Sequence, residues 1–355
     1  MRILHIDTEK GFRGGELQVL LLMEGLKKRG HENFLVASND VLIKKAHPLT
    51  ESISAINPYR IFDIINVLKI CKFIEFSKAD IIHLHTAHAH LIGGIAGKIK
   101  RKKIVVTRRV DFPIKSRFKY NCLADKVIAI SKAIEKVLLE GGIIENKIVL
   151  IPSGIDTNKF ENVKPADYLF REFNIPDKRL MIGTIAHLTD HKGHTYLLDA
   201  IPQILKEFPH SFFLFVGDGE LKDSLRTKSR ILGIRDKVFF TGFREDIPEI
   251  FSVLDLFVLP SHLEGLCTSL MDAMYTGVPI VATTAGGIPE VVENEKTGLL
   301  VPPKDPNALA EAIIKLLKDK DKRETFAIEG KKRVLQKFAA SEMVEKVEQV
   351  YLSLL

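Results

Sequence analysis

Residues 254–283 read LDLFVLPSHLEGLCTSLMDAMYTGVPIVAT, and this stretch decides the fold. An apolar run at 254–260 leads into a polar turn, then a helix-like segment, and a second apolar run follows at 279–283. Two buried strands joined through a helix form the βαβ unit of a parallel sheet. The stretch therefore predicts parallel α/β architecture.

The same alternation runs along the whole chain. Each apolar run is followed by a helix-like segment, which excludes all-β and all-α folds. Besides the two runs above, strands are expected at 2–7, 32–38, 80–85, 103–108, 126–130, 147–151, 180–186, 211–216, 237–241 and 298–301.

Prolines and a glycine interrupt this pattern between the two halves, at Pro152, Gly154, Pro165 and Pro176. We therefore expect two doubly wound α/β domains at 1–165 and 166–338. Residues 339–355 are expected to form a C-terminal helix that packs back on the first domain. Ligands of such sheets bind beyond the carboxyl ends of the strands, so we expect the two domains to face a cleft.

The composition is that of a globular chain. It has 355 residues, 46% of them apolar, and no low-complexity segment. Its three cysteines, Cys71, Cys122 and Cys267, are widely spaced, which argues against a disulfide framework or a thiolate zinc site. Charge precedes any signal-like apolar run at the amino terminus, and no stretch is long enough to span a membrane. These features predict a cytoplasmic protein.

Charge is divided unevenly between the halves. The net charge is +7, and residues 1–165 alone contribute +11. Basic residues concentrate at 98–119, where Phe112, Phe118 and Tyr120 are interleaved with them. This stretch predicts peripheral contact with the anionic inner face of the cytoplasmic membrane. A solvated surface is the alternative interpretation.

Glycine loops follow several predicted strands. Gly14 and Gly15 open the first helix, where the backbone can approach an anion closely; a plain tight turn is the alternative. No loop has the dinucleotide-binding glycine spacing, and residues 93–98 fail the phosphate-loop pattern. Later loops contribute Lys192 before a helix, Gly217 and Gly219 in a second turn, and Phe243 in a third.

The loop after residue 260 combines the groups that a nucleotide sugar requires. Glu264 supplies a carboxylate for sugar hydroxyls, and Asp272 supplies a second for ribose hydroxyls. The amides of Leu266, Cys267, Thr268 and Ser269 form a helix amino terminus suited to phosphate. Both carboxylates could instead only stabilise the helix amino terminus.

Four histidines lie close in sequence at His83, His85, His88 and His90. Two of them, spaced His-x-His, share one face of a predicted strand end and could hold a metal in a hydrolase. No carboxylate ligand can be assigned to such a site. Substrate contact by a histidine and packing are the other interpretations.

The stretch 260–300, with Glu264 and Asp272 eight residues apart, closely resembles the retaining glycosyltransferases of family 4. Further matches follow the family's order over nearly the whole chain, at 14–15, 127–131, 151–156, 192–193 and 216–219. The resemblance implies the GT-B fold, with two Rossmann-like domains and a donor nucleotide sugar on the second. It also implies an acceptor largely on the first domain, no required metal or other cofactor, and retention at the anomeric carbon.

The resemblance carries over to individual residues. Glu264 matches the glutamate at the donor sugar, and Lys192 matches the diphosphate lysine. Residues 266–269 occupy the phosphate-amide turn, and Gly14 and Gly15 the first-domain phosphate loop.

Three positions depart from the family pattern. Asp272 replaces a second glutamate, and His187 replaces a diphosphate arginine. Arg109 stands where many members have a cleft histidine, so Arg109 and His85 are the candidates for its catalytic role.

These observations predict a retaining glycosyltransferase that acts on an envelope glycan or glycolipid, such as lipopolysaccharide or capsule. A nucleotide-sugar epimerase of the same architecture is the main alternative, and a metal hydrolase built on the histidines is a weaker one. Nucleic acid is not an expected partner, because the donor motif is intact.

Overall fold

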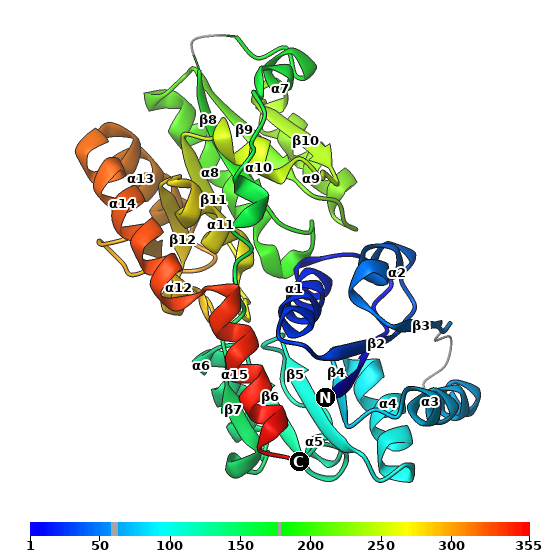
Figure 1. The fold of residues 1–355 in the computed structure, drawn as a ribbon. Helices are drawn as coiled ribbons and strands as arrows, with labels where there is room; N and C mark the ends of the chain where they lie inside the picture. The colour runs from blue at the N-terminus through cyan, green and yellow to red at the C-terminus, as the bar shows by residue number, and fades with distance from the viewer. Residues whose placement is uncertain (58–62, 177–178) are drawn as a thin grey trace. The chain divides into compact units, whose positions relative to one another are not determined.

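The computed structural model describes residues 1–57, 63–176 and 179–355. The chain divides into two compact units (Figure 1). Unit 1 comprises Met1–Gly154 and Phe338–Leu355, and unit 2 comprises Ile155–Lys337. Among the described residues, no helix is both long and apolar enough to cross a membrane.

Unit 1 contains a seven-stranded parallel sheet in the order β3-β2-β1-β4-β5-β6-β7. Six strands lie where the sequence predicts them. The seventh, β3, is a short edge strand whose alternating serines carry little apolar signal. The strands are β1 (Arg2–Asp7), β2 (Glu32–Ala37), β3 (Ser52–Ala55), β4 (Ile81–Leu84), β5 (Lys103–Arg108), β6 (Lys126–Ala129) and β7 (Ile148–Leu150).

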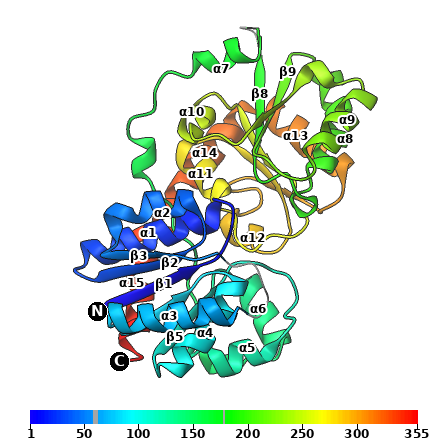
Figure 2. The ribbon, with the colours of Figure 1, turned by 90° about the vertical axis from the view of Figure 1, so that its right-hand side faces the viewer.

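Helices cover both faces of this sheet (Figure 2). They are α1 (Gly14–Lys28), α2 (Asp40–Ala46), α3 (Ile64–Ser77), α4 (Ala87–Ile99), α5 (Arg117–Leu123), α6 (Lys132–Glu140) and α15 (Ala340–Leu352). Glycines of α4 permit close packing, since a Cβ on Gly93 would meet Leu84 at 2.5 Å and one on Gly97 would meet Ile104 at 2.7 Å. The glycines that fail the phosphate-loop pattern therefore pack α4 against the sheet.

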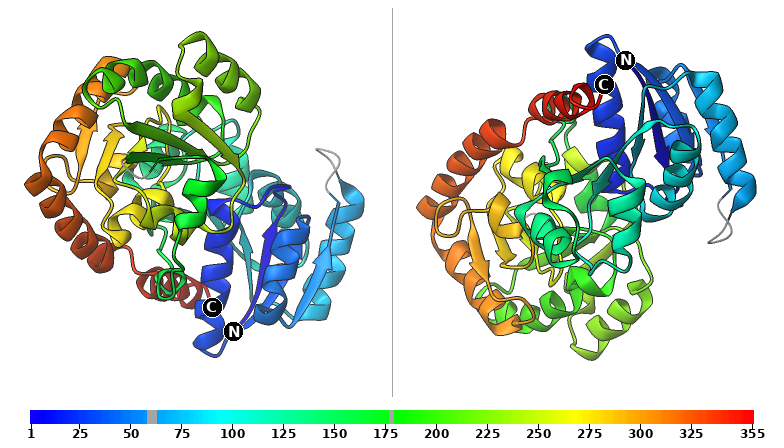
Figure 3. Two further views of the ribbon diagram at one scale, coloured as in Figure 1. Left: turned by 90° about the horizontal axis from the view of Figure 1, so that it is seen from above. Right: turned by 90° about the horizontal axis from the view of Figure 1, so that it is seen from below.

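The C-terminal helix α15 returns to unit 1 and packs on the opposite face of the sheet, beside α1. Its residues Met343, Val344, Val347, Val350 and Tyr351 are buried with Ile3 of β1 and neighbouring strand residues. A Cβ on Gly25 of α1 would meet Val344 at 2.4 Å, so the two helices touch closely. Both chain termini lie in this unit, where Met1 and Leu354 pack against the same cluster (Figure 3). The predicted return of the C-terminal helix is confirmed.

Unit 2 contains a six-stranded parallel sheet in the order β10-β9-β8-β11-β12-β13. Its strands are β8 (Leu180–Ile185), β9 (Ser211–Val216), β10 (Val238–Gly242), β11 (Leu256–Leu259), β12 (Ile280–Thr283) and β13 (Leu299–Val301). Its helices are α7 (Asp167–Glu172), α8 (His194–Glu207), α9 (Lys222–Ile231), α10 (Ile247–Ser252), α11 (Thr268–Thr276), α12 (Ile288–Val291), α13 (Pro306–Lys318) and α14 (Lys320–Lys337).

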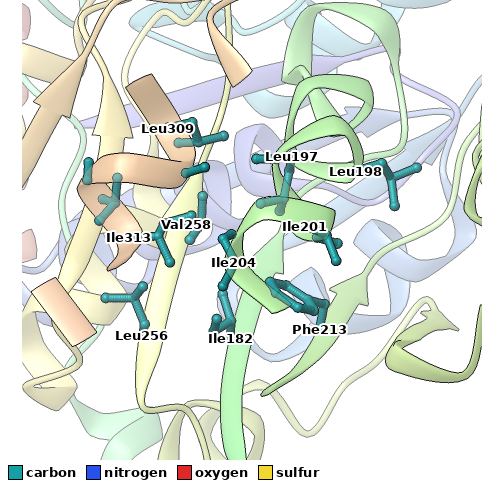
Figure 4. Close-up of a cluster of buried hydrophobic side chains, with 14 of the residues drawn as sticks. Ile182, Leu197, Leu198, Ile201, Ile204, Phe213, Leu256, Val258, Leu309 and Ile313 are labelled. Atoms are coloured by element: carbon teal, nitrogen blue, oxygen red, sulfur yellow. The ribbon is translucent and has the colours of Figure 1, made fainter. Parts of the chain in front are cut away.

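The core of unit 2 lies between its sheet and helices α8 and α13 (Figure 4). Ile204 of α8 lies near Ile182 of β8, Ile201 of α8 near Phe213 of β9, and Ile313 of α13 near Leu256 of β11. Apolar residues on one stripe of each helix produce this layer.

Strand order reverses once in each sheet, between β1 and β4 in unit 1 and between β8 and β11 in unit 2. At such a switch point the connections leave in opposite directions, and the carboxyl ends of the two strands border a ligand crevice. The loops after these four strands are therefore the candidate functional segments of the two units.

Candidate functional site

Lys192 and Glu264 meet at the switch point of unit 2. Lys192 follows β8 and Glu264 follows β11, and Lys192 Nζ donates to Glu264 Oε2 at 2.5 Å. Both side chains are largely buried, 17% and 9% exposed. The structure thus joins two predicted site residues that are 72 positions apart.

Two glycines allow the loops that carry Lys192 and Glu264 to pack closely against neighbouring backbone. Gly193 has φ of +69°, and a Cβ there would lie 2.0 Å from the carbonyl oxygen of Pro260. A Cβ on Gly286 would lie 1.8 Å from the carbonyl oxygen of Glu264. Only glycine allows these backbones to approach so closely.

Helix α11 begins immediately beyond Glu264. Cys267 is its N-cap residue, and its side chain makes no capping hydrogen bond to the helix backbone. The first amide groups of α11, which include those of Thr268 and Ser269, therefore have no side-chain cap. Leu266 and Cys267 are buried, and burial raises the pKa of the Cys267 thiol.

Asp272 lies one turn further along α11 and is buried. Lys159 Nζ donates to its Oδ2 at 2.8 Å. Burial raises the pKa of Asp272, and Lys159 opposes that rise. Sequence reasoning missed Lys159, because it belongs to none of the motifs and lies 113 positions from its partner.

The remaining residues that the sequence predicts to bind the donor have different surroundings. Gly217 and Gly219 lie where the loop after β9 packs on the loop after β8, since Cβ atoms there would meet the carbonyl oxygens of Ala186 and Leu188. Phe243 follows the edge strand β10 and is 60% exposed. The structure does not join Phe243 to the Lys192–Glu264 pair.

Gly14 and Gly15 begin α1 at the switch point of unit 1. The Arg109 side chain lies against Gly15, because a Cβ on Gly15 would be 3.6 Å from Arg109 Cδ. Two carboxyl groups, Asp7 and Glu16, interact electrostatically with Arg109. Burial raises the pKa of Asp7 to about 6 and that of Glu16 to about 7. Arg109 Nε is buried and has no hydrogen-bond partner in the described part of the chain.

The four neighbouring histidines do not form one cluster. His90 lies on α4, where its Nε2 donates to the carbonyl oxygen of Lys119 at 2.9 Å. His83 and His85 instead join His5 of β1, which the sequence analysis did not single out. The predicted metal cluster of neighbouring histidines is therefore wrong. His83 and His85 group with His5, and His90 does not belong to that group.

The buried group His5, His83 and His85 could offer metal ligands, since one nitrogen of each lies within 4.8 Å of the others. Yet His83 bonds through Nδ1 to Tyr351 Oη at 2.5 Å and through Nε2 to Thr107 Oγ1 at 2.7 Å. His5 is likewise occupied on both nitrogens, by His85 and Asn33. A metal would have to displace these hydrogen bonds, and no carboxylate among the described residues completes the set.

The basic stretch 98–119 does not form one patch. Strand β5 lies between the two parts of this stretch, and its residues Ile104, Val105 and Val106 are buried. Residues 98–103 therefore lie at the amino-terminal end of β5, and residues 108–119 lie at and beyond its carboxyl-terminal end. The six residues of the strand separate the two parts by about 17 Å. Linear charge counting cannot detect this separation.

Comparison with known proteins identifies the family. Residues 166–333 match the family model described as glycosyl transferases group 1, and residues 12–159 match that of glycosyltransferase family 4. The chain belongs to the group 1 glycosyltransferases.

Similar glycosyltransferases span the full chain. An Escherichia coli protein named UDP-Gal:alpha-D-GlcNAc-diphosphoundecaprenol alpha-1,3-galactosyltransferase is 23% identical over 98% of both chains. The Staphylococcus aureus capsular polysaccharide biosynthesis glycosyltransferase CapM is 26% identical over 93% of this chain and 92% of its own. The structure of Anabaena HepE in complex with UDP and glucose has a TM-score of 0.88 and 24% identity over all of both chains. This glycosyltransferase therefore has the GT-B fold, as the resemblance implied.

Proposed function

We propose that this glycosyltransferase moves a sugar from a nucleoside diphosphate donor to a hydroxyl group of an envelope glycan or glycolipid, with retention at the anomeric carbon. The observation that carries the proposal is the Lys192–Glu264 pair at the switch point of unit 2, beside the amino terminus of α11. A cation, a carboxylate and free helix amides are the groups that a nucleotide sugar requires.

Each group has a distinct role in the proposed complex. Lys192 and the first amides of α11 bind the diphosphate, and Glu264 accepts hydrogen bonds from the sugar. Asp272, oriented by Lys159, accepts hydrogen bonds from the ribose hydroxyls. Because the diphosphate would attract Lys192, we expect the donor to weaken the ion pair that Lys192 forms with Glu264 in the free protein.

Retention follows if the acceptor attacks on the face from which the diphosphate leaves. The sugar–oxygen bond to the diphosphate breaks, the bond to the acceptor oxygen forms, and the departing phosphate oxygen takes the acceptor proton. No strong protein acid is required, because fixed positive charge and amides stabilise the leaving diphosphate. Lys192 and the amides can neutralise the diphosphate without a metal ion.

The acceptor is assigned to unit 1, where Arg109 and His85 follow β5 and β4. The names of the relatives above refer to a lipid-linked sugar and to capsular polysaccharide, which supports a glycan or glycolipid acceptor. These relatives are transferases and do not favour the epimerase alternative.

Peripheral attachment to the cytoplasmic face of an anionic membrane is part of the proposal. We assign it to residues 98–103, at the amino-terminal ends of the strands, because α3 ends there with the exposed Phe76. Ile64, Ile65 and Leu68 of α3 are also more than half exposed, but they lie further along the helix, towards the carboxyl-terminal ends of the strands. Lys100 bonds to Glu75 of α3, which brings residues 98–103 and α3 together. Apolar side chains flanked by lysines are typical of helices that lie on bilayers.

Donor binding and turnover test the proposed function. UDP, GDP and their hexose conjugates are screened by calorimetry, and the binding donor is incubated with lipid-linked and soluble saccharides. We expect nucleotide release that depends on an acceptor and a product with retained anomeric configuration by NMR. Release of free nucleotide and an epimerised sugar without acceptor would favour the epimerase instead.

A further inference from the structure

Asn33 of β2 has only one possible orientation. Its Nδ2 donates to the carbonyl oxygens of Met23 and Leu49, at 2.7 and 3.2 Å. A flipped amide would bring its oxygen against these two carbonyl oxygens. The buried Asn33 Oδ1 therefore faces His5 and can only accept a hydrogen bond.

This orientation determines the tautomers of two histidines. His5 Nε2 lies 3.2 Å from Asn33 Oδ1 and must carry the proton. Neutral His5 then has a lone pair at Nδ1, which lies 3.1 Å from His85 Nε2. His85 Nε2 must donate this second hydrogen bond, so neutral His85 has its lone pair at Nδ1.

Both imidazoles are neutral at physiological pH. Burial lowers the pKa of His5 to about 4, and it lowers the pKa of His85 well below the ordinary value. Repulsion from protonated His83 and His5 and from the Arg109 guanidinium would lower the pKa of His85 further.

His85 Nδ1 has no hydrogen-bond partner in the described part of the chain. A buried acceptor without a partner is energetically unfavourable, so this nitrogen is suited to a hydroxyl donor. His85 also follows β4 at the switch point of unit 1, where ligands of doubly wound sheets bind.

We propose that Asn33 and His5 are positioning residues that hold His85 with an unprotonated Nδ1, and that this nitrogen accepts a hydrogen bond from a hydroxyl group of the sugar acceptor. The second half of the proposal rests on the proposed glycosyl transfer. His85 orients the hydroxyl and does not retain its proton, because an imidazolium would be buried beside His83 and near Arg109.

The tautomers are tested by ¹⁵N NMR of the full chain labelled at histidine, with His85→Gln and His5→Gln used for assignment. In the free protein we expect His85 Nδ1 to be unprotonated and Nε2 protonated. In Asn33→Leu, both tautomers should become populated at His5 and His85. Asn66→Leu is the matched control, because Asn66 is also buried and bonds to Asn57 and Asp63, not to a histidine.

A protonated His85 Nδ1 in the wild type overturns the proposal even if Asn33→Leu does not fold. Unchanged tautomers in a folded Asn33→Leu also overturn it. Added Zn²⁺ that shifts His5 Nδ1 and His85 Nε2 together, at stoichiometric concentration, would show a metal site instead.

The hydroxyl contact is tested by titrating UDP- or GDP-loaded protein with methyl α-glycosides of glucose, galactose, mannose and N-acetylglucosamine. A selective change in the ¹⁵N chemical shift of His85 Nδ1 supports the contact. If no glycoside changes it, a fixed water occupies the position of the hydroxyl, and the second half of the proposal is overturned. Calorimetry of UDP and GDP on the same sample separates the two proposals. If neither UDP nor GDP binds, the proposed function is refuted and the tautomer result is unaffected.

Discussion

Removal of Lys192 tests the energetics of the proposed donor site in the absence of any substrate. The Glu264 side chain is 9% exposed and lies 2.5 Å from Lys192 Nζ, and Lys192→Ala removes this partner. Breaking a buried ion pair from one side costs about 3–5 kcal/mol, because a desolvated charge remains. Lys192→Ala/Glu264→Gln removes both charges, so we expect it to recover about 1–3 kcal/mol of that loss.

The loss converts to a measurable change in melting temperature. In a domain of 150–250 residues, 1 kcal/mol shifts the midpoint by about 2–4 °C. Lys192→Ala should therefore lower the midpoint of unit 2 by about 6–20 °C. Lys222→Ala is the control, since Lys222 pairs with the exposed Asp218 at 3.4 Å in the same unit. An exposed pair of this kind contributes about 0.2–1 kcal/mol.

Thermal and urea unfolding of the four proteins, followed by circular dichroism, provide the measurement. The reasoning is refuted if the single and double variants have equal stability, or if Lys222→Ala costs as much as Lys192→Ala. Calorimetry adds a functional measurement, because Lys192→Ala should weaken binding of the nucleoside diphosphate far more than binding of the nucleoside.

Four further predictions concern pH, metal, the acceptor unit and the membrane. Burial lowers the pKa of His194 to about 3, so its contribution to stability is complete above about pH 6.5 and is lost as the pH falls, at up to about 1.4 kcal/mol per pH unit. His194→Phe should flatten the acid side of the stability profile, and parallel profiles would contradict this. Glycosyl transfer should persist in EDTA; complete loss that one divalent ion restores would show a metal requirement. Arg109→Ala should reduce kcat sharply if Arg109 replaces the missing cleft histidine, whereas an unchanged rate would leave His85 as the candidate. Binding to anionic liposomes should fall as salt is added. It should also fall in the quadruple variant Lys100→Ser/Arg101→Ser/Lys102→Ser/Lys103→Ser and in Leu68→Ser/Phe76→Ser. The control is Lys115→Ser/Arg117→Ser, beyond the carboxyl-terminal end of β5, which should bind normally.

Local sequence determined most of the secondary structure. Buried parallel strands are continuous apolar runs, so twelve of the strands are readable from runs such as 211–216 and 254–260. Only β3, which reads Ser-Ile-Ser-Ala at an edge, lacks that signal. The glycines at the amino termini of α1 and α8 and the apolar stripe of α15 are also local features, because backbone freedom and helical periodicity depend on neighbouring residues.

Tertiary structure decided which of these residues meet. Parallel register places His5 beside His83 although 78 positions separate them, and Lys159 reaches Asp272 across 113 positions. Strand β5 also separates residues 98–103 from residues 108–119, although both segments belong to one short basic stretch of the sequence. Such contacts depend on strand order and register, which arise from packing of the whole sheet. No local pattern encodes them, and for this reason the sequence alone predicted a donor motif but neither the Lys159 partner of Asp272 nor the Asn33–His5–His85 chain.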